Sequence, residues 1–267
     1  MIYRISVIKK QSRKITPRRV ASRLFSRPVL ALTLFLNCLN VPAHADNYSQ
    51  AEQFLVDIPV VELFTSQGCP NCPKADSSLA SLHADGRVLA LSVHIDYWNY
   101  GGWVDRYSSP ENSQRQVEYK EAMSLPYIFT PQFVINGKLS LENQARSGVE
   151  MALKMLSAEP NSIAAEIAES EDGHAITLTS EASGSVFRLQ FVLFDSPMMT
   201  VPTAGRNRGK TIVNAHPVMA WLPQQDWHGS TRTVPWPEAD SYGVALLVTN
   251  PATLEILLTV ARLGAGT

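Results

Sequence analysis

The sequence has few cysteines, no long apolar run and no internal repeat, and each absence excludes a class of protein. Three cysteines in 267 residues are too few for a small fold that depends on a framework of disulfides. The longest apolar run is about 13 residues, whereas a helix that spans a bilayer needs about 20. A solenoid or other repeat architecture is excluded because no segment recurs along the chain.

Acidic residues are absent from the first 45 residues, which carry nine Lys and Arg. The basic part is followed by the apolar stretch PVLALTLFLNCLNV and then by AHA, immediately before Asp46. This order is typical of a secretory signal peptide, with an uncleaved membrane anchor as the alternative. We therefore expect residues 1–45 to be removed and the mature chain to be exported, either to the periplasm or as a secreted protein. No stable membrane span is expected after cleavage.

Positive charge is scarce after residue 45: 14 Lys and Arg stand against 24 Asp and Glu, hence a net charge of −10. Such a surface argues against nucleic acid or anionic lipid as a partner. Cys38 lies in the signal segment, so the mature chain keeps Cys69 and Cys72. In an oxidising compartment two remaining cysteines normally pair.

The pattern of apolar and turn residues predicts alternating strands and helices up to residue 159. A helix beginning near Cys72 is expected because Ala75, Leu79 and Leu82 recur at helical spacing. Ser108 and Glu111 have the spacing of a capping box, and Asn136 with Gly137 forms the strongest short signal for a hairpin. The predicted elements are strands at 58–64 and 87–98, helices from 72, from 108 and at 143–157, and a hairpin at 130–141.

The pattern changes at Glu159-Pro160, after which the segments 162–180, 184–196 and 242–250 indicate strands. We expect an α/β fold with two domains. The first covers 46–159, and the second, at 160–267, is smaller, mostly β and sandwich-like.

Cys69 and Cys72 admit three interpretations: a redox pair, a metal site and an inert bridge. A structural zinc site needs four ligands, and the mature chain has no second cysteine pair. A bridge that closes so short a loop stabilises little. Thiol–disulfide exchange needs an attacking thiolate and a neighbouring thiol. Cys69, just before the helix, suits the first role because free N–H groups and the helix dipole stabilise its thiolate, and Cys72 suits the second.

Four stretches carry a resemblance: VELFTSQGCPNCPKAD, HIDYWNYGGW, TPQFVING and GRNRGKT. They resemble a bacterial family of secreted thioredoxin-like proteins, catalogued as a domain of unknown function (number twelve twenty-three). The resemblance implies a thioredoxin-like fold in which Pro131 is cis and the backbone of Thr130 pairs with the substrate. It also suggests Glu62, in the strand before the cysteines, as a candidate proton relay.

The aromatic residues Tyr97 and Trp98 follow the second predicted strand, near the cysteine pair, where they would shape a substrate surface. His94 lies just before them and could join Cys69 and Cys72 in a metal site. Packing in the core is the simpler interpretation of this histidine.

These observations predict an exported thiol–disulfide oxidoreductase that acts on protein thiols and disulfides and is recycled by an unidentified redox partner. No cofactor is expected. The alternative is a periplasmic copper-binding or copper-delivery module that uses Cys69, Cys72 and His94. A structural exported protein with a vestigial disulfide is the third class.

Overall fold

The computed structural model describes residues 54–142, 145–156, 162–170, 173–182, 184–239 and 241–264. All of them belong to one compact unit. The predicted signal peptide, residues 1–45, and the predicted domain boundary at residues 159 and 160 lie outside the described residues. No helix in the described ranges is long and apolar enough to span a membrane.

The predicted fold class is wrong. Strands make up 41% and helices 20% of the described residues, in several antiparallel sheets with three α-helices. The chain is therefore mostly β rather than an α/β thioredoxin-like domain with a smaller β appendage. The described part of residues 162–264 alone contributes ten strands, β6 to β15, and no α-helix, so the part expected to be accessory contributes most of the sheet.

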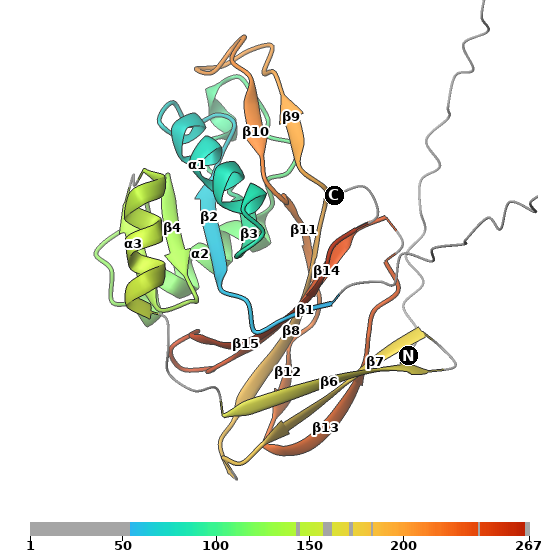
Figure 1. Ribbon diagram of the computed structural model, residues 1–267. Coiled ribbons are helices and arrows are strands. Elements are labelled where there is room, and N and C mark those ends of the chain that lie inside the picture. Colours follow the sequence, from blue (N-terminus) through green and yellow to red (C-terminus); the bar gives the residue numbers. More distant parts are fainter. Residues whose placement is uncertain are drawn as a thin grey trace, which may run out of the picture. The chain divides into compact units, whose positions relative to one another are not determined.

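The candidate site is built on a four-stranded sheet in the order β3-β2-β4-β5 (Figure 1). Strands β2 and β3 are parallel, whereas β4 is antiparallel to both β2 and β5. Asn136 and Gly137 both have positive φ, which makes the tight turn of the predicted hairpin. The strands are β2 (Val60–Thr65), β3 (Leu89–His94), β4 (Gln132–Ile135) and β5 (Leu139–Glu142).

Helices α1 (Cys72–Ala84) and α3 (Arg146–Leu156) cover one face of this sheet. Successive side chains of a strand point to opposite faces, so Val61 and Leu63 pack with Leu79 of α1 while Val60 and Phe64 enter a different core. This alternation decides which polar side chains of β2 and β3 can reach the cysteines.

Helix α2 (Pro110–Ala122) borders the other core, into which it inserts Tyr119. It begins one residue later than the predicted capping box: the hydroxyl of Ser109, not Ser108, accepts the hydrogen bond from the Asn112 N–H. Glu111 in the first turn suits the positive end of the helix dipole. A short 3-10 helix, η1 (Asn99–Gly101), precedes α2.

A six-stranded antiparallel sheet holds the two halves of the chain together, because β1 near residue 54 pairs with β15 near residue 262. The strand order is β1-β15-β14-β8-β11, with β12 also paired to β8. The strands are β1 (Phe54–Val56), β8 (Phe187–Phe194), β11 (Val218–Trp221), β12 (Gln225–Trp227), β14 (Gly243–Thr249) and β15 (Ile256–Arg262).

A three-stranded sheet, β13-β7-β6, shares an apolar core with the six-stranded sheet, formed by side chains such as Ile176, Phe191 and Trp236. Its strands are β6 (Ile163–Ser170), β7 (Gly173–Ser180) and β13 (Ser230–Pro235). A separate hairpin, β9 (Met198–Thr200) with β10 (Ile212–Asn214), lies beside α1 (Figure 1). This hairpin brings a loop of the second half to the cysteines.

Candidate active site

Cys69 and Cys72 form a disulfide at the start of α1, where the chain turns from β2 into the helix. The Cys69 N–H donates to the Ser66 carbonyl and the Gly68 N–H to the Ser66 hydroxyl. A Cβ at Gly68 would stand 3.1 Å from the carbonyl oxygen of Trp98, so the turn packs tightly against the segment after β3. Cys69 is 1% and Cys72 0% exposed. The disulfide is therefore covered in this structure.

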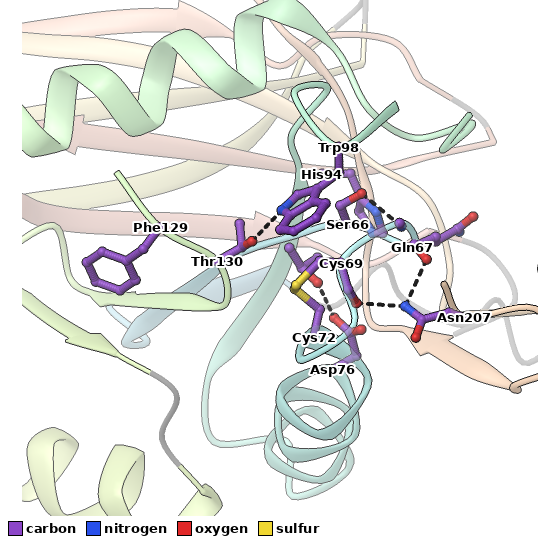
Figure 2. Close-up of a disulfide and its surroundings, with 12 residues drawn as sticks. Ser66, Gln67, Cys69, Cys72, Asp76, His94, Trp98, Phe129, Thr130 and Asn207 are labelled. Carbon is purple, nitrogen blue, oxygen red and sulfur yellow. Dashed lines mark hydrogen bonds between the residues drawn. A yellow bond between two sulfur atoms is a disulfide. The ribbon is translucent and has the colours of Figure 1, made fainter. Parts of the chain in front are cut away.

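Asp76 lies one helical turn after Cys72, on the same face of α1, and is 1% exposed (Figure 2). Thr65 points to this face of the sheet, and its hydroxyl donates to Asp76 Oδ1 at 2.7 Å. Asp76 Oδ2 is buried and has no hydrogen-bond partner among the described residues. Buried polar atoms are nearly always paired, so this oxygen is an exception that needs an explanation.

His94 is the register partner of Thr65 in the neighbouring strand and is equally buried. Its Nδ1 lies 2.7 Å from Asp105 Oδ2, and Asp105 also accepts hydrogen bonds from the N–H groups of Gln67 and Tyr107. The Nε2 of His94 has no partner in the described part of the chain. The His94–Asp105 pair therefore fixes the turn that carries Cys69 and places an imidazole near Asp76.

The ionisation of these groups follows from burial and charge. Burial raises the pKa of Asp76 from 3.8 to about 7, against smaller lowering effects of the Thr65 hydrogen bond and the charge of His94. Burial alone lowers the pKa of His94, but the charge and hydrogen bond of Asp105 and the charge of Asp76 raise it above its ordinary value. The pKa of Asp105 falls because His94 and backbone N–H groups outweigh its burial. Burial thus brings the pKa of the Asp76 carboxyl into the neutral range.

The loop between β9 and β10, residues 201–211, lies against the disulfide turn, and we call it the cover loop. Asn207, 0% exposed, donates from Nδ2 to the carbonyls of Gln67 at 3.0 Å and Cys69 at 2.6 Å (Figure 2). Gln67 in turn donates to the side chains of Thr200 and Asn214 at the ends of the hairpin strands. The cover loop is held to the backbone of the cysteine turn by side-chain amides.

The predicted substrate-binding residues are brought to the disulfide from two segments. Trp98 Nε1 donates to the Thr130 hydroxyl at 2.7 Å, and the Thr130-Pro131 peptide bond is cis. Figure 2 shows Trp98, Thr130 and Cys69 close together. Tyr97 instead donates its hydroxyl to Gln116 of α2, and burial raises its pKa to about 12. Trp98 and Thr130 thus border the disulfide, and the Tyr97 hydroxyl links Thr130 to Gln116 of α2.

Glu62, the candidate proton relay, is fully buried but faces away from α1. It lies on the Val60 and Phe64 face of β2, where its carboxylate bonds to Arg115 at 2.6 Å and to the hydroxyl of Tyr119 at 2.5 Å. The Arg115 guanidinium also stacks over Trp221, at 4.1 Å from the ring centre. These contacts give Glu62 a partner with full opposite charge on the side of the sheet opposite the cysteines.

The alternative metal site gains no support from the arrangement. Within the described ranges, no three His, Cys, Asp or Glu side chains are grouped closely enough to hold a metal ion. His94, the proposed third ligand with Cys69 and Cys72, bonds to Asp105 through Nδ1, and its Nε2 has no partner in the described part of the chain.

Comparison with known proteins adds the family. Residues 60–249 match the family described as "Protein of unknown function (DUF1223)". The chain belongs to this family. The matched span of DUF1223 includes the disulfide, Asp76, His94, Asp105 and Asn207, so the whole candidate site lies within the family's common region.

A solved structure is also similar to this DUF1223 member. It is the crystal structure of Protein AGR_C_4864 from Agrobacterium tumefaciens, which is 29% identical, with a TM-score of 0.64. The likeness covers 78% of this chain and 95% of that protein. No curated protein matches the chain.

Sequence reasoning missed Asp76, Asp105 and Asn207. Asp76 had a readable signal: it stands four residues after Cys72, on the apolar face of the predicted helix that also holds Leu79, where an acid is costly to bury. Asp105 and Asn207 had no comparable signal, since their partners come from separate segments of the chain.

Proposed function

We propose that the protein is an exported thiol–disulfide oxidoreductase that exchanges electrons with protein thiols through Cys69 and Cys72. The observation that carries the proposal is Asp76. It is a buried acid with a pKa of about 7, one helical turn after Cys72 in α1. A disulfide that only braces a fold has no use for a proton-exchanging group beside it. An exchanging pair needs one, because the resolving cysteine alternates between thiol and thiolate.

The exchange proceeds in two balanced steps. A substrate thiolate attacks Cys69 Sγ, a new sulfur–sulfur bond forms, and the Cys69–Cys72 bond breaks with Cys72 leaving as a thiolate that takes the proton of Asp76. A second substrate thiolate then attacks the substrate sulfur of the mixed disulfide and releases Cys69. Two substrate thiols are oxidised and the enzyme pair is reduced, and the same steps run in reverse when the enzyme is the reductant.

We propose Asp76, rather than Glu62, as the residue that exchanges a proton with Cys72. Asp76 shares its helical face with Cys72, and its free oxygen is available for the proton. Glu62 is neutralised by Arg115 on the opposite face of β2. Because an acid works best when its pKa lies near the working pH, the value of about 7 for Asp76 suits a relay at neutral pH.

Attack on Cys69 requires the cover loop to move, since the sulfurs are buried. The loop is fixed by the two hydrogen bonds that Asn207 donates to the Gln67 and Cys69 carbonyls. Breaking such bonds costs a few kcal/mol at most, so opening is compatible with turnover. On the other side of the disulfide, Trp98 and Thr130 supply the surface along which we expect a substrate segment to bind.

Export is part of the same proposal. The basic, apolar and small-residue order of residues 1–45 supports a signal peptide, and an oxidising compartment maintains a reactive disulfide.

The proposal is tested by trapping. Purified Cys72→Ala, mixed with an oxidised protein substrate, should accumulate a mixed disulfide at Cys69, because the resolving thiol is gone. The matched variant Cys69→Ala should accumulate none, because Cys69 precedes α1, where free N–H groups stabilise a thiolate, whereas Cys72 lies within the helix. Adducts formed equally by both variants, or by neither, would contradict the assignment of Cys69 as the attacking residue.

A further inference from the structure

A cavity of about 350 Å³ opens beside the disulfide. It is lined by the two residues between the cysteines, by the first turn of α1 and by the cover loop: Pro70, Asn71, Pro73, Lys74 and Lys210. We call it the cation pocket. Because Pro70 and Asn71 lie between the two cysteines, a group bound in this pocket would lie beside the turn that carries the disulfide.

The pocket is positively charged without compensation. The Lys74 ammonium has no partner among the described residues, and the Lys210 ammonium donates to the neutral amide oxygen of Asn207 at 2.9 Å. The first turn of α1 contains no acid, and neither does the cover loop. Arg206 and Arg208 add two exposed cations on the same loop.

This local charge opposes the charge of the chain. From residue 46 on, acids exceed Lys and Arg by ten, yet the first turn of α1 and the cover loop together carry four cations and no acid. A positively charged surface attracts negatively charged ligands and raises their rate of association. The apolar walls provided by Pro70 and Pro73 suit the stem of an amino-acid side chain.

We infer that the cation pocket binds acidic side chains next to the reactive cysteine of the substrate, so that the preferred substrates are cysteine-containing segments rich in Asp or Glu. The inference rests on the proposed exchange function and adds its substrate class. A carboxylate bound by Lys210 also competes with Asn207 for that ammonium. Binding of an acidic side chain would therefore remove the Lys210 hydrogen bond from Asn207, the residue that holds the cover loop to the Cys69 carbonyl.

The kinetic test uses three peptide disulfides that differ only beside the cysteine, where Glu, Gln or Lys is placed. With reduced wild-type protein at low salt, the exchange rate should fall in that order, by roughly tenfold from Glu to Lys. High salt should bring the three rates together because exposed charges are screened.

Lys74→Gln and Lys210→Gln should each reduce the preference for Glu, and the double variant should abolish it. Lys120→Gln, which removes a cation of α2 outside the pocket, should preserve it. Equal rates for the three peptides with wild-type protein, or a preference that survives the double variant, would overturn the inference and leave the exchange function standing.

A second measurement does not depend on redox chemistry. Oxidised protein is titrated with a cysteine-free Glu-Ser-Glu peptide while the amide NMR signals of Asn71 and Lys74 are followed, with Gln-Ser-Gln as the control. Saturable shifts with the acidic peptide only are expected. If no peptide disulfide exchanges, the proposed function fails, and this titration alone decides whether the pocket binds acids. Identical responses to both peptides would then refute it.

Discussion

The substitution Asp76→Asn tests whether Asp76 exchanges a proton with Cys72. It should change both the pH dependence of the free energy of unfolding and the rate at which mixed disulfides are resolved. In the unfolded chain the Asp76 carboxyl has its ordinary pKa of 3.8, whereas burial raises it to about 7 in the folded protein. Between these values the unfolded state releases the proton and the folded state keeps it. Stability contributed by the neutral acid is therefore lost as pH rises.

The magnitude follows from the shift. Three pKa units correspond to about 4 kcal/mol. Roughly 2–3 kcal/mol of this is lost between pH 5 and pH 8.5, because the first part of the loss already occurs between the unfolded-state pKa and pH 5. Asn keeps an oxygen for the Thr65 hydroxyl but cannot ionise. Asp76→Asn should therefore gain about that much stability over the wild type between the two pH values.

Urea unfolding of the oxidised proteins at pH 5 and pH 8.5 measures the difference in free energy of unfolding between Asp76→Asn and the wild type. Asp226→Asn, at an exposed acid of β12, is the control. Its difference in free energy of unfolding from the wild type should be nearly the same at both pH values. The same Asp76→Asn protein should resolve mixed disulfides at least tenfold more slowly at neutral pH, as expected for loss of a proton acceptor. If the stability difference between Asp76→Asn and the wild type does not depend on pH, Asp76 is not a buried acid with a raised pKa.

Two further variants test the cover loop and the assignment of the proton relay. Asn207→Ala removes both bonds that hold the cover loop, so dithiothreitol should reduce the disulfide roughly tenfold faster, as about 1.4 kcal/mol of easier opening predicts. An unchanged rate would show that the loop does not limit access. Glu62→Gln leaves the Arg115 charge buried without its partner and should cost about 3–5 kcal/mol of stability, while the folded variant resolves mixed disulfides at the wild-type rate. Slow resolution in this variant would return the relay to Glu62.

The local elements of the site could be predicted from the sequence because their signals are local. The β-branched run before Cys69, the helical spacing after Cys72 and the Asn136-Gly137 turn each involve adjacent residues, and each lies where it was expected. The cap of α2 was misplaced by one residue because Ser108 and Ser109 are both good caps and only backbone geometry selects between them.

The fold class could not be predicted in the same way, because it depends on pairings between distant segments. Phe54 pairs with Arg262, and no local pattern encodes such a partner. The CxxC motif and its helix are local features, whereas the many strands of the second half, β6 to β15, determine the fold class. Asn207 was missed for the same reason: it bonds to Cys69 across 138 residues of sequence.

The reduction potential of Cys69–Cys72 decides whether this disulfide exchanges electrons or only braces the fold. The purified protein is equilibrated with graded ratios of reduced and oxidised dithiothreitol, and the thiols are counted by mass after alkylation. A redox-active pair should equilibrate within the experiment, at a potential between about −270 and −120 mV, the range of known exchange proteins. A potential below about −300 mV, as in structural disulfides, would contradict it.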